Sequence, residues 1–540
     1  STAIAAFEAQ VTVGGLGPWS YAGQLTLRRR AGHWLVAWSP AAIHPALRSG
    51  QHLARTRTLP PRSDILAADG SKLTTTGTSV TVGLEPDHVK DRQAVLDALQ
   101  QTIGADPVAV GKSIDGAASH PSQFLAVAEV EEARFAAVKP TLNPIPGVLF
   151  RRHPARLAAT GDLAAHVVGS VGPVTAEQVA KLGPTVLAGD LVGQSGLEAA
   201  AQRQLAGTPG GDVHVADAIG ATVASLQTFP GAPGQAVRTS LNLQIQKAAE
   251  HALDGVAQPA ALVAIQASTG AVEASVSRPV GQEFDRALDG RYPPGSTFKV
   301  ITTTALLGKG ITPATPVTCP PSIVAGGRKF TNFEGETQPT LSFTQAFAES
   351  CNTAFIGLSS RLDAADLVGA ANLYGFGLEP GLGLPAVGGR LPQPADATEL
   401  AADAIGQGRV DASPLAMAEV AAAVDSGAWR PPTLAPGLGP GPAPAAAPRP
   451  LDPAPATSLR QLMAEVVAQG TGRAAAVPGP AVSGKTGTAE FGSAQPPQTH
   501  AWFIGFRGDL AFAVLVEGGG VGGQVAAPIA ARFLEGVPAG

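Results

Sequence analysis

The sequence predicts a multidomain α+β protein, and three observations support this prediction. The chain has 540 residues, which is enough for several domains and a sizeable core. Its composition, 44% hydrophobic and 15% charged residues, is typical of a folded protein. The hydrophobic patterns run from a strand-rich start, through a mixed middle, to a last region where strands flank a mainly helical stretch. We therefore expect strands from both ends of that last region to close one sheet.

Charge and hydropathy exclude some classes of protein. The net charge of -5 and the pI near 6.1 argue against a nucleic-acid partner, and no basic run with interleaved aromatic residues is present. No apolar run reaches membrane-spanning length. The chain begins at Ser1 without an initiator methionine, so we expect any signal or anchor to lie outside this sequence.

The first two regions alternate strand and turn signals. Trp34 and Trp38, in the strand-rich start, are expected to be core residues. A new unit begins around 62–70, and a Pro/Gly-rich run at 230–234 marks its end. The predicted elements are strands at 8–13, 19–29 and 33–38, helices at 93–103, 176–181 and 197–205, and a helix cap at 193–198.

The last region opens with a strand at 237–241 and contains a hairpin of two strand-like runs. Residues 431–455 are dense in proline, alanine and glycine, and are predicted to be a mobile loop or an extended linker. The other predicted elements are helices at 243–253, within 342–362, and at 415–424, 458–469 and 528–534, and strands at 261–266, 271–276, 501–506 and 510–517.

The stretch Arg291–Lys299 organises this region. Two prolines and a glycine precede an apolar, helix-length run, which predicts a helix with Ser296 in its first turn. Ser296 and Lys299 are three residues apart and would share one helix face. A lysine in apolar surroundings is able to remove the proton of a serine nucleophile. Ser-x-x-Lys alone is common by chance, so further motifs have to support a catalytic role.

Two such motifs follow. Ser350 and Asn352 lie between helical runs, and positions two apart reach one site only from a loop or a helix end. An ordinary helix cap is the alternative for both residues. Lys485, Thr486, Gly487 and Thr488 lie on a strand-like piece, where Gly487 would let another backbone approach closely.

Ser-x-x-Lys, Ser-x-Asn and Lys-Thr-Gly in this order resemble the signature of penicillin-binding proteins and serine β-lactamases. The similarity to class B penicillin-binding proteins extends over nearly the whole chain. It includes that class's pedestal domain, and Trp34–Leu47 resembles the end of the NTF2-like domain of the methicillin-resistance type, which we expect to be partial here. The matching segments are 62–70, 193–198, 292–299, 350–355, 405–408, 483–490 and 500–506.

The resemblance implies three domains and an activity. The expected domains are an NTF2-like domain at 1–57, an α+β pedestal at 58–235, and at 236–540 a serine β-lactamase/transpeptidase-like domain with an antiparallel sheet and helices on both faces. The implied activity is that of a peptidoglycan D,D-transpeptidase, which cross-links stem peptides through an acyl-enzyme and is acylated by β-lactams.

The resemblance also implies a role for each motif residue. Ser296 would attack the carbonyl of the penultimate D-Ala after Lys299 takes its proton. Ser350, held by Lys299 and Lys485, would relay a proton to the leaving amine. Asn352 would hold the substrate amide.

The strand residues would recognise the terminal carboxylate. The charge of Lys485 and the hydroxyls of Thr486 and Thr488 would bind it, and the amides of Ser296 and Thr488 would form the oxyanion hole. Because Lys485 and Thr486 nominally face opposite sides of a strand, we expect the site to wrap round an edge strand.

No metal or cofactor is expected. The implied partners are a D-Ala-D-Ala donor, an amine acceptor, β-lactams, and a separate glycosyltransferase within a cell-wall synthesis complex. The implied location is the bacterial cell envelope, at the extracytoplasmic face of the plasma membrane.

Three rival activities share these motifs. A β-lactamase is a far smaller single domain and needs a base for the deacylating water. A D,D-carboxypeptidase differs only in its acceptor, and a non-catalytic β-lactam receptor keeps the same residues. Chain length and the pedestal-like region favour a transpeptidase without a glycosyltransferase region.

Some details depart from the family pattern or suggest other sites. Asp285 stands where the family often has asparagine, and Ser63 where glycine is usual. Residues 479–486 match a P-loop pattern, but a poor strand precedes them and no helix follows, so we interpret the match as coincidence. Cys319 and Cys351 are expected to be small buried residues, although the implied location permits a disulfide between them.

Overall fold

The structure is a computed structural model that describes residues 1–159, 161–280, 282, 284–332, 337–438, 446–494 and 496–538, without the side chains of Ala118, Ala133 and Pro154. The chain divides into two compact units. One contains residues 1–71 and 162–540, and the other contains residues 72–161.

The unit 72–161 is a three-stranded antiparallel sheet with helices packed on it. The helix predicted at 93–103 is confirmed as α1, and its buried Leu99 contributes to the same core as Val82 of the central strand and Phe135. The elements of this unit are β6 (Thr74–Leu84), β7 (Leu125–Glu131), β8 (Val148–Ala158), α1 (Arg92–Ile103), α2 (Pro107–Gly116) and α3 (Glu132–Leu142), with the 3-10 helices η2 (Pro86–His88) and η3 (Ala117–Ser119).

The start of the larger unit confirms the predicted strands but not the predicted core tryptophans. The strands are β1 (Thr2–Val13), β2 (Gly17–Arg30) and β3 (His33–Val36), an antiparallel sheet in the order β1-β2-β3. Trp34 is 47% exposed and Trp38 is 72% exposed, so the core assignment was wrong. Strand β3 is an edge strand, and every one of its residues is exposed. The alternation of hydrophobic residues predicts a strand, but it does not tell whether another layer covers the sheet.

The part of this unit between β3 and residue 238 is made of short elements. They are η1 (Pro40–Ala42), β4 (His52–Thr58), β5 (Ile65–Leu66), α4 (Ala165–Val168), β9 (Val171–Pro173), α5 (Ala176–Leu182), β10 (Leu191–Gly193), α6 (Gly196–Ala200), α7 (Gln202–Ala206), β11 (Gly210–Ala216), β12 (Thr222–Phe229) and β13 (Val237–Arg238). Strands β12, β11 and β4 form one sheet in that order, and β13 pairs with β5. The predicted helix at 176–181 is confirmed as α5, whereas the predicted strand at 237–241 is shorter.

Arg62 explains why the helix predicted at 197–205 is two short helices, α6 and α7. Its Nη2 donates to the main-chain oxygen of Glu198 at 2.6 Å, and its Nε contacts the carboxylate of Glu198, which is fully buried. A continuous helix would need that main-chain oxygen for residue 202. Instead Gln202 accepts from Arg62 Nη1 through its side chain at 2.8 Å.

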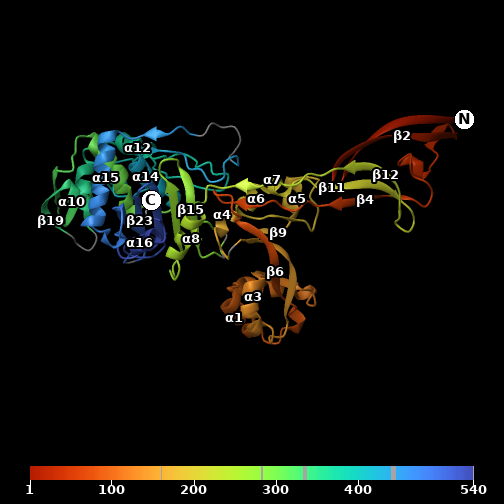
Figure 1. Cartoon of the computed structure of the whole chain (residues 1–540), viewed down its shortest axis with the longest axis horizontal. Helices are drawn as coiled ribbons and strands as arrows, with labels where there is room; N and C mark the ends of the chain where they lie inside the picture. Colours follow the sequence, from red (N-terminus) through yellow and green to blue (C-terminus); the bar gives the residue numbers. More distant parts are fainter. Residues whose placement is uncertain are drawn as a thin grey trace. The chain divides into compact units, whose positions relative to one another are not determined.

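The residues from 236 onward are built on a five-stranded antiparallel sheet in the order β15-β14-β24-β23-β22. Figure 1 labels two of its strands, β15 and β23. The predicted hairpin is confirmed as β14 and β15, and the C-terminal strands pair next to it, so the sheet is closed from both ends as predicted. Its strands are β14 (Ala260–Gln266), β15 (Ala271–Arg278), β22 (Ser483–Phe491), β23 (Gln498–Arg507) and β24 (Leu510–Val516).

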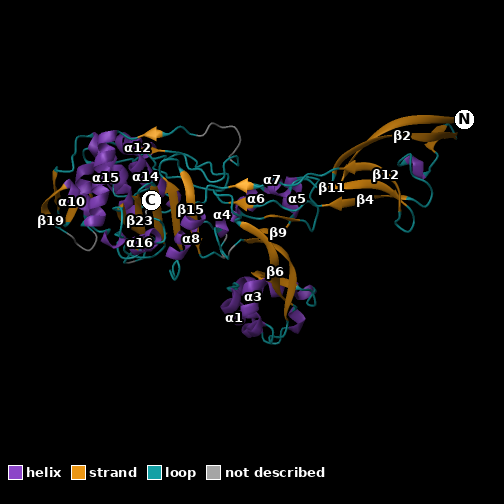
Figure 2. Ribbon diagram, in the orientation of Figure 1, coloured by secondary structure: helices purple, strands orange, loops and turns teal. Residues whose placement is uncertain are grey.

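Helices cover both faces of this sheet. Alternate residues such as Leu262 and Val514 pack with α8 (Leu243–Ala252) and α16 (Ala526–Glu535) into one core. The intervening residues, such as Val263, are buried as well and face α14 (Pro414–Ser426), which contacts three of the strands. Figure 2 shows the labelled strands β15 and β23 enclosed among these helices.

The helical stretch between β15 and β22 carries most of the remaining predicted helices. The predictions at 342–362, 415–424 and 458–469 are confirmed as α10 with α11, α14 and α15. Among the described residues, no helix is both long enough and apolar enough to cross a membrane. The further elements are η4 (Gly295–Phe298), α9 (Lys299–Gly308), β16 (Pro316–Cys319), β17 (Ser322–Ala325), β18 (Arg328–Thr331), β19 (Gln338–Ser342), α10 (Phe343–Ala348), α11 (Asn352–Ser359), α12 (Ala364–Leu373), α13 (Ala397–Asp403), β20 (Ala428–Trp429), β21 (Arg449–Pro450), α15 (Pro453–Ala468) and η6 (Arg473–Ala475).

The stretch 431–455 is not simply an extended linker. Leu434 is 1% exposed and Leu451 is 5% exposed, β21 pairs with β20, and α15 begins at Pro453. The two leucines anchor both ends of the stretch, which composition alone does not reveal. Its central residues 439–445 lie outside the described part, so the predicted loop there is not assessed.

Glu419 is a buried carboxyl at the centre of α14. One carboxylate oxygen accepts a hydrogen bond from Trp429 Nε1 at 2.6 Å, and the other oxygen has no hydrogen-bond partner in the described structure. Burial raises the pKa of Glu419 to about 8. The folded protein therefore binds this proton more tightly than the unfolded chain, where a glutamate titrates near pH ~4.3.

The stability that Glu419 contributes should therefore be present at low pH and be lost as pH rises toward 8. We expect Glu419→Gln, which keeps an acceptor for Trp429, to flatten the dependence of Tm on pH between about 5 and 8.5. Thermal unfolding across that range measures both slopes. Equal slopes of Tm against pH for the two proteins would contradict the raised pKa of Glu419.

Candidate active site

Ser296 lies in the 3-10 helix η4, directly before α9, so the predicted helix start is confirmed. The turn begins at Gly295, whose φ is +52°, a conformation that favours glycine. A Cβ on Gly295 would lie 3.0 Å from the Cβ of Ala489 and 3.1 Å from the main-chain oxygen of Thr488. The absence of a side chain thus lets the turn rest against the edge strand β22.

Lys299 is the first residue of α9, and its side chain is fully buried. Its Nζ donates to the main-chain oxygen of Ser350 at 2.6 Å and to Asn352 Oδ1 at 2.7 Å. The Ser350 hydroxyl lies 3.3 Å from the same amine. The lysine of the first motif is therefore held by the second motif.

Ser350 and Asn352 come from the loop between α10 and α11, as their spacing predicted. Ser350 has a φ of +62°, which is unusual for a residue with a side chain. Its amide donates to the main-chain oxygen of Phe347 at 3.1 Å, and Asn352 is the first residue of α11. This turn lets both side chains reach one site.

Lys485 approaches from the opposite side. It lies on β22, which is the edge strand of the sheet, and its side chain is fully buried. Its Nζ donates to the Ser350 hydroxyl at 2.8 Å and to the main-chain oxygen of Thr486 at 3.0 Å. Two lysine amines from distant segments thus contact one serine hydroxyl.

Ser296 opens into a cavity of about 340 Å³, whose lining includes five of the predicted site residues. Lys299 and Lys485 lie beneath it, as donors to the lining residue Ser350. The lining residues are Ser296, Thr331, Asn332, Glu349, Ser350, Asn352, Gln407, Thr471, Thr486, Thr488, Glu490, Val521, Gly523 and Gln524.

The strand residues are tied to neighbouring loops. Thr486 Oγ1 and Thr471 Oγ1 are 2.5 Å apart, and Thr488 Oγ1 accepts from the amide of Gly522 at 3.2 Å. A Cβ on Gly487 would lie 3.0 Å from the main-chain oxygen of Pro294, so the backbone approaches closely there. This packing brings β22 alongside the segment that carries Ser296.

The loop at 405–408 supports the turn of Ser296 from the other side. The amide of Gly295 donates to the main-chain oxygen of Gly406 at 3.0 Å, and a Cβ on Gly406 would collide with Gly295. Asp403 braces this loop by accepting from the amide of Arg409 at 2.7 Å, and burial raises the pKa of Asp403 to about 6. Gln407 donates to the main-chain oxygen of Thr488 at 3.4 Å, which links the loop to β22.

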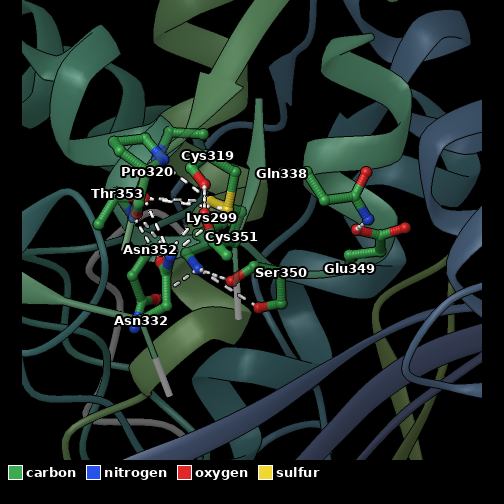
Figure 3. Close-up of a disulfide and its surroundings, with 12 residues drawn as sticks. Lys299, Cys319, Pro320, Asn332, Gln338, Glu349, Ser350, Cys351, Asn352 and Thr353 are labelled. Atoms are coloured by element: carbon green, nitrogen blue, oxygen red, sulfur yellow. Dashed lines mark hydrogen bonds between the residues drawn. A yellow bond between two sulfur atoms is a disulfide. The ribbon is translucent and has the colours of Figure 1, made fainter. Parts of the chain in front are cut away.

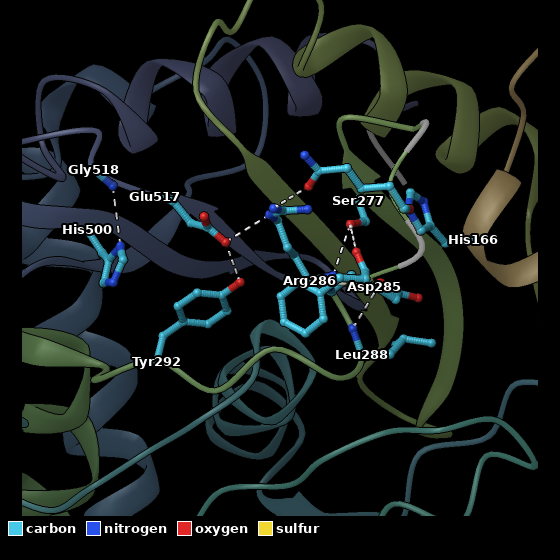
Figure 4. Close-up of polar contacts among 12 residues, drawn as sticks. His166, Ser277, Asp285, Arg286, Leu288, Tyr292, His500, Glu517 and Gly518 are labelled. Carbon is cyan, nitrogen blue, oxygen red and sulfur yellow. Dashed lines mark hydrogen bonds and ion pairs between the residues drawn. The ribbon is translucent and has the colours of Figure 1, made fainter. Parts of the chain in front are cut away.

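A polar network fixes the chain just before the turn (Figure 4). The hydroxyl of Tyr292 donates to Glu517 Oε1 at 2.6 Å, and Arg286 Nε donates to the same oxygen at 2.8 Å. Asp285 accepts from the amides of Ala287 at 2.9 Å and Leu288 at 3.3 Å. Asp285 therefore serves as a turn acceptor, and burial is the main cause that raises its pKa.

His500, also in Figure 4, closes the aromatic cluster beside Tyr292. Its ring stacks on Phe491 at 3.9 Å between centroids, and its Nδ1 accepts from the amide of Gly518 at 3.3 Å. Burial lowers the pKa of His500 to about 4, so the ring is neutral near pH 7. The cluster packs the outer ends of β22 and β23 against the segment before Ser296.

Cys319 and Cys351 form a disulfide, with Cα atoms 6.2 Å apart. Both cysteines are buried, as expected, but the expectation that they are separate residues was wrong. The bond ties the end of β16 to the residue between Ser350 and Asn352 (Figure 3). Chain separation hides such a pairing, because only the fold brings the two segments together.

Asn332 reinforces the same junction. Its side-chain amide donates to the main-chain oxygen of Pro320 at 2.9 Å and to Thr353 Oγ1 at 3.1 Å, and its Oδ1 accepts from the amide of Thr353 at 2.9 Å. Asn332 is 6% exposed and lines the cavity. Sequence reasoning missed Asn332 and Thr471, which belong to no motif, and Glu349, which directly precedes Ser350 but lies outside the Ser-x-Asn motif.

The P-loop pattern at 479–486 has no P-loop structure. Lys485 and Thr486 lie inside β22, which continues as a strand to Phe491. In a phosphate-binding loop, a helix would begin at these two residues instead. The interpretation of this match as coincidence is confirmed.

The geometry fits one class of protein, the serine acyltransferases, because a serine at a helix start lines the cavity and two buried lysine amines contact the hydroxyl of Ser350. Comparisons with known proteins identify the family. The model of the penicillin-binding protein transpeptidase domain matches residues 260–535, so the chain belongs to this family. A penicillin-binding protein dimerisation domain matches 57–239, and an NTF2-like N-terminal transpeptidase domain matches 1–51. The expected class B family and its multidomain α+β fold are thereby confirmed.

Individual relatives of this chain are named peptidoglycan D,D-transpeptidases. The peptidoglycan D,D-transpeptidase PbpA of Mycobacterium tuberculosis is 35% identical over 358 residues, which cover 56% of this chain and 72% of that protein. The peptidoglycan D,D-transpeptidase MrdA of Acinetobacter baumannii is 27% identical, over 74% of this chain and 68% of that protein.

A solved complex of PBP2 with MreC from Helicobacter pylori matches with a TM-score of 0.66 and 20% identity, over 90% of this chain and 98% of the other. At that identity the likeness concerns the fold alone.

The disulfide should matter for the site as well as for stability. Replacing both cysteines by serine keeps a helix-capping oxygen at position 351 but frees the loop that carries Ser350. We expect acylation by penicillin to slow about tenfold, because small displacements of a catalytic group are costly. Stopped-flow acylation of the double variant measures the change, and an unchanged rate would show that the hydrogen bonds of Asn332 and Lys299 hold the loop without the disulfide.

Proposed function

We propose that Ser296 is the nucleophile of this peptidoglycan D,D-transpeptidase and forms an acyl-enzyme with a stem peptide ending in D-Ala-D-Ala. The observation that carries the proposal is the contact of two buried amines, Lys299 and Lys485, with the Ser350 hydroxyl beside the cavity of Ser296. Family membership and the activity named for the relatives support the reaction class.

In the first step, Lys299 takes the proton of Ser296 as the oxygen attacks the carbonyl of the penultimate D-Ala. Two ammonium groups around one hydroxyl repel each other, so an arrangement in which one amine is neutral is favoured. We assign the role of base to Lys299, since it lies one helical turn from Ser296.

In the second step, the C–N bond of the substrate breaks and the leaving amine needs a proton. The Ser350 hydroxyl delivers it and is replenished from the lysine amines that contact it. Terminal D-Ala leaves, and an ester joins Ser296 to the stem peptide. An amine of a second stem then attacks this ester, gives one proton back through Ser350, and leaves a peptide cross-link with Ser296 restored.

The remaining site residues bind and orient the donor. Lys485, Thr486 and Thr488 are proposed to bind the terminal carboxylate, with the cation strengthening the hydrogen bonds of the two hydroxyls. The amides of Ser296 and Thr488 are proposed to stabilise the oxyanion, where each donor typically contributes about 10²–10³-fold. Asn352 is proposed to hold the substrate amide, and Gly487 to leave room for this close packing.

The rival activities differ in how the acyl-enzyme is resolved. A β-lactamase needs a base that activates the deacylating water, and two carboxylates, Glu349 and Glu490, line the cavity. The persistence of a penicillin adduct is therefore the observation that separates a transpeptidase from a β-lactamase, which would hydrolyse the adduct. A carboxypeptidase would transfer the acyl group to water in place of an amine, and a receptor would bind β-lactams without turning over stem peptides.

The cellular setting follows from the reaction. Peptidoglycan synthesis places the protein in the cell envelope, and we propose the extracytoplasmic face of the plasma membrane with a separate glycosyltransferase as partner. The similarity, at 26% identity and a TM-score of 0.66, to a structure titled for coordinated polymerisation and cross-linking by a peptidoglycan synthase complex supports that partner. We further propose domain boundaries near residues 57 and 235, which the matched family ranges support.

Substitution of the nucleophile and its base tests the proposal. Ser296→Ala should form no covalent penicillin adduct and should cross-link no stem peptide, while Lys299→Ala should lose at least about 10²-fold in acylation rate because the hydroxyl keeps its proton. Intact-mass spectrometry after incubation with penicillin measures the adduct, and Glu535→Gln on the exposed end of α16 is a matched surface control. A penicillin adduct on Ser296→Ala would refute the assignment.

A further inference from the structure

A transpeptidase needs room for two peptides. On the function proposed above, Ser350 protonates the leaving amine, and by microscopic reversibility the attacking amine has to reach the same point. The attacking amine belongs to a stem peptide that is much larger than the departing D-Ala. The cavity of Ser296 should therefore continue on the side of Ser350.

A second cavity lies on that side. It has a volume of about 440 Å³ and shares Glu349 and Thr471 with the first cavity, so the two adjoin along this pair. Glu349 directly precedes Ser350, and Thr471 contacts Thr486 of the edge strand. The second cavity is thus next to the point where the leaving amine departs.

The lining of the second cavity is polar and carries both signs of charge. Glu349 is held by Gln338, whose Nε2 donates to Glu349 Oε2 at 2.8 Å, and Figure 3 shows this pair beyond Ser350. Arg473 lies on the same cavity, is exposed, and donates to the main-chain oxygen of Gln469. A carboxylate and a guanidinium in one cavity match a ligand that carries an ammonium group and a carboxylate.

We propose that this second cavity, which we call the acceptor subsite (Gln338, Glu349, Gln469, Thr471 and Arg473), binds the amine-bearing stem peptide. Glu349 attracts its ammonium group and Arg473 binds a carboxylate of the same peptide. The ammonium loses one proton to water, the neutral amine attacks the ester of Ser296, the C–O bond breaks and a C–N bond forms. The remaining surplus proton passes through Ser350 to the oxygen of Ser296.

The experiment compares acceptors of different size with one donor. The donor is a D-Ala-type thioester that acylates Ser296, and the acceptors are a tripeptide with a free side-chain amine and a C-terminal carboxylate, and hydroxylamine. The measured quantity is the ratio of aminolysis to hydrolysis. The variants are Glu349→Gln, Arg473→Gln and Arg473→Lys, with Glu535→Gln and the exposed Arg361→Gln as matched controls.

The acceptor subsite predicts a selective loss. The ratio with the tripeptide should fall about tenfold in Glu349→Gln and Arg473→Gln, since each removes a charge-assisted contact, while Arg473→Lys retains part of it. Hydroxylamine, which needs no subsite, should give ratios within about twofold of the unaltered protein.

Two results would overturn the inference in distinguishable ways. Tripeptide ratios that equal those of the controls would refute the subsite and leave the proposed function standing. A protein that is acylated by the thioester but transfers to neither acceptor would refute the proposed function itself. An equal loss with both acceptors would assign these residues to Ser350 positioning and would also refute the subsite.

Discussion

The site depends on one contact: the hydroxyl of Ser350 lies within hydrogen-bond reach of the amines of both Lys299 and Lys485. Burying two lysines is costly, and the oxygens of Ser350, Asn352 and Thr486 offset part of that cost. The arrangement is stable only if the three segments that carry these residues are held rigidly. Much of the surrounding structure serves that purpose.

A different set of contacts fixes each of the three segments. Glycine at position 295 lets the turn of Ser296 rest on β22, and the Tyr292–Glu517–Arg286 network fixes the chain before it. The disulfide fixes the loop of Ser350, whose backbone conformation is itself unfavourable and has to be imposed by its surroundings. Lys485 is positioned by its register on the edge strand β22. The next residue of that strand, Thr486, contacts Thr471, which lies outside the sheet.

The sequence predicted whatever depends on local periodicity or on a specific motif order. Helices such as α1, α8 and α14, the β14–β15 hairpin, and the loop position of Ser350 follow from residues close together in the chain. Arg62 breaks the helix at 197–205 through a contact 136 residues away. The exposure of Trp34 depends on which faces other segments cover. Such long-range contacts carry no local signal.

The same limit applies within the site. Ser296, Lys299, Ser350, Asn352 and Lys485 were predicted as site residues because the order and spacing of their motifs resemble a known family signature. Asn332 and Thr471 act through contacts that only the fold creates, and the pairing of Cys319 with Cys351 joins strands and loops with no shared pattern. The second cavity could not be predicted at all, because its walls come from β16, β19, the residue after α10 and the segment after α15.

The most direct test of the account follows the fate of penicillin on the unaltered protein. After a stoichiometric dose, intact-mass spectrometry and peptide mapping locate the adduct while free penicilloate is measured in parallel. The account predicts a single adduct on Ser296 that persists for many minutes, because the opened antibiotic blocks the acceptor and neither Glu349 nor Glu490, which line the cavity, is expected to activate a deacylating water. An adduct on another residue, or complete hydrolysis of a large excess within that time, would contradict it.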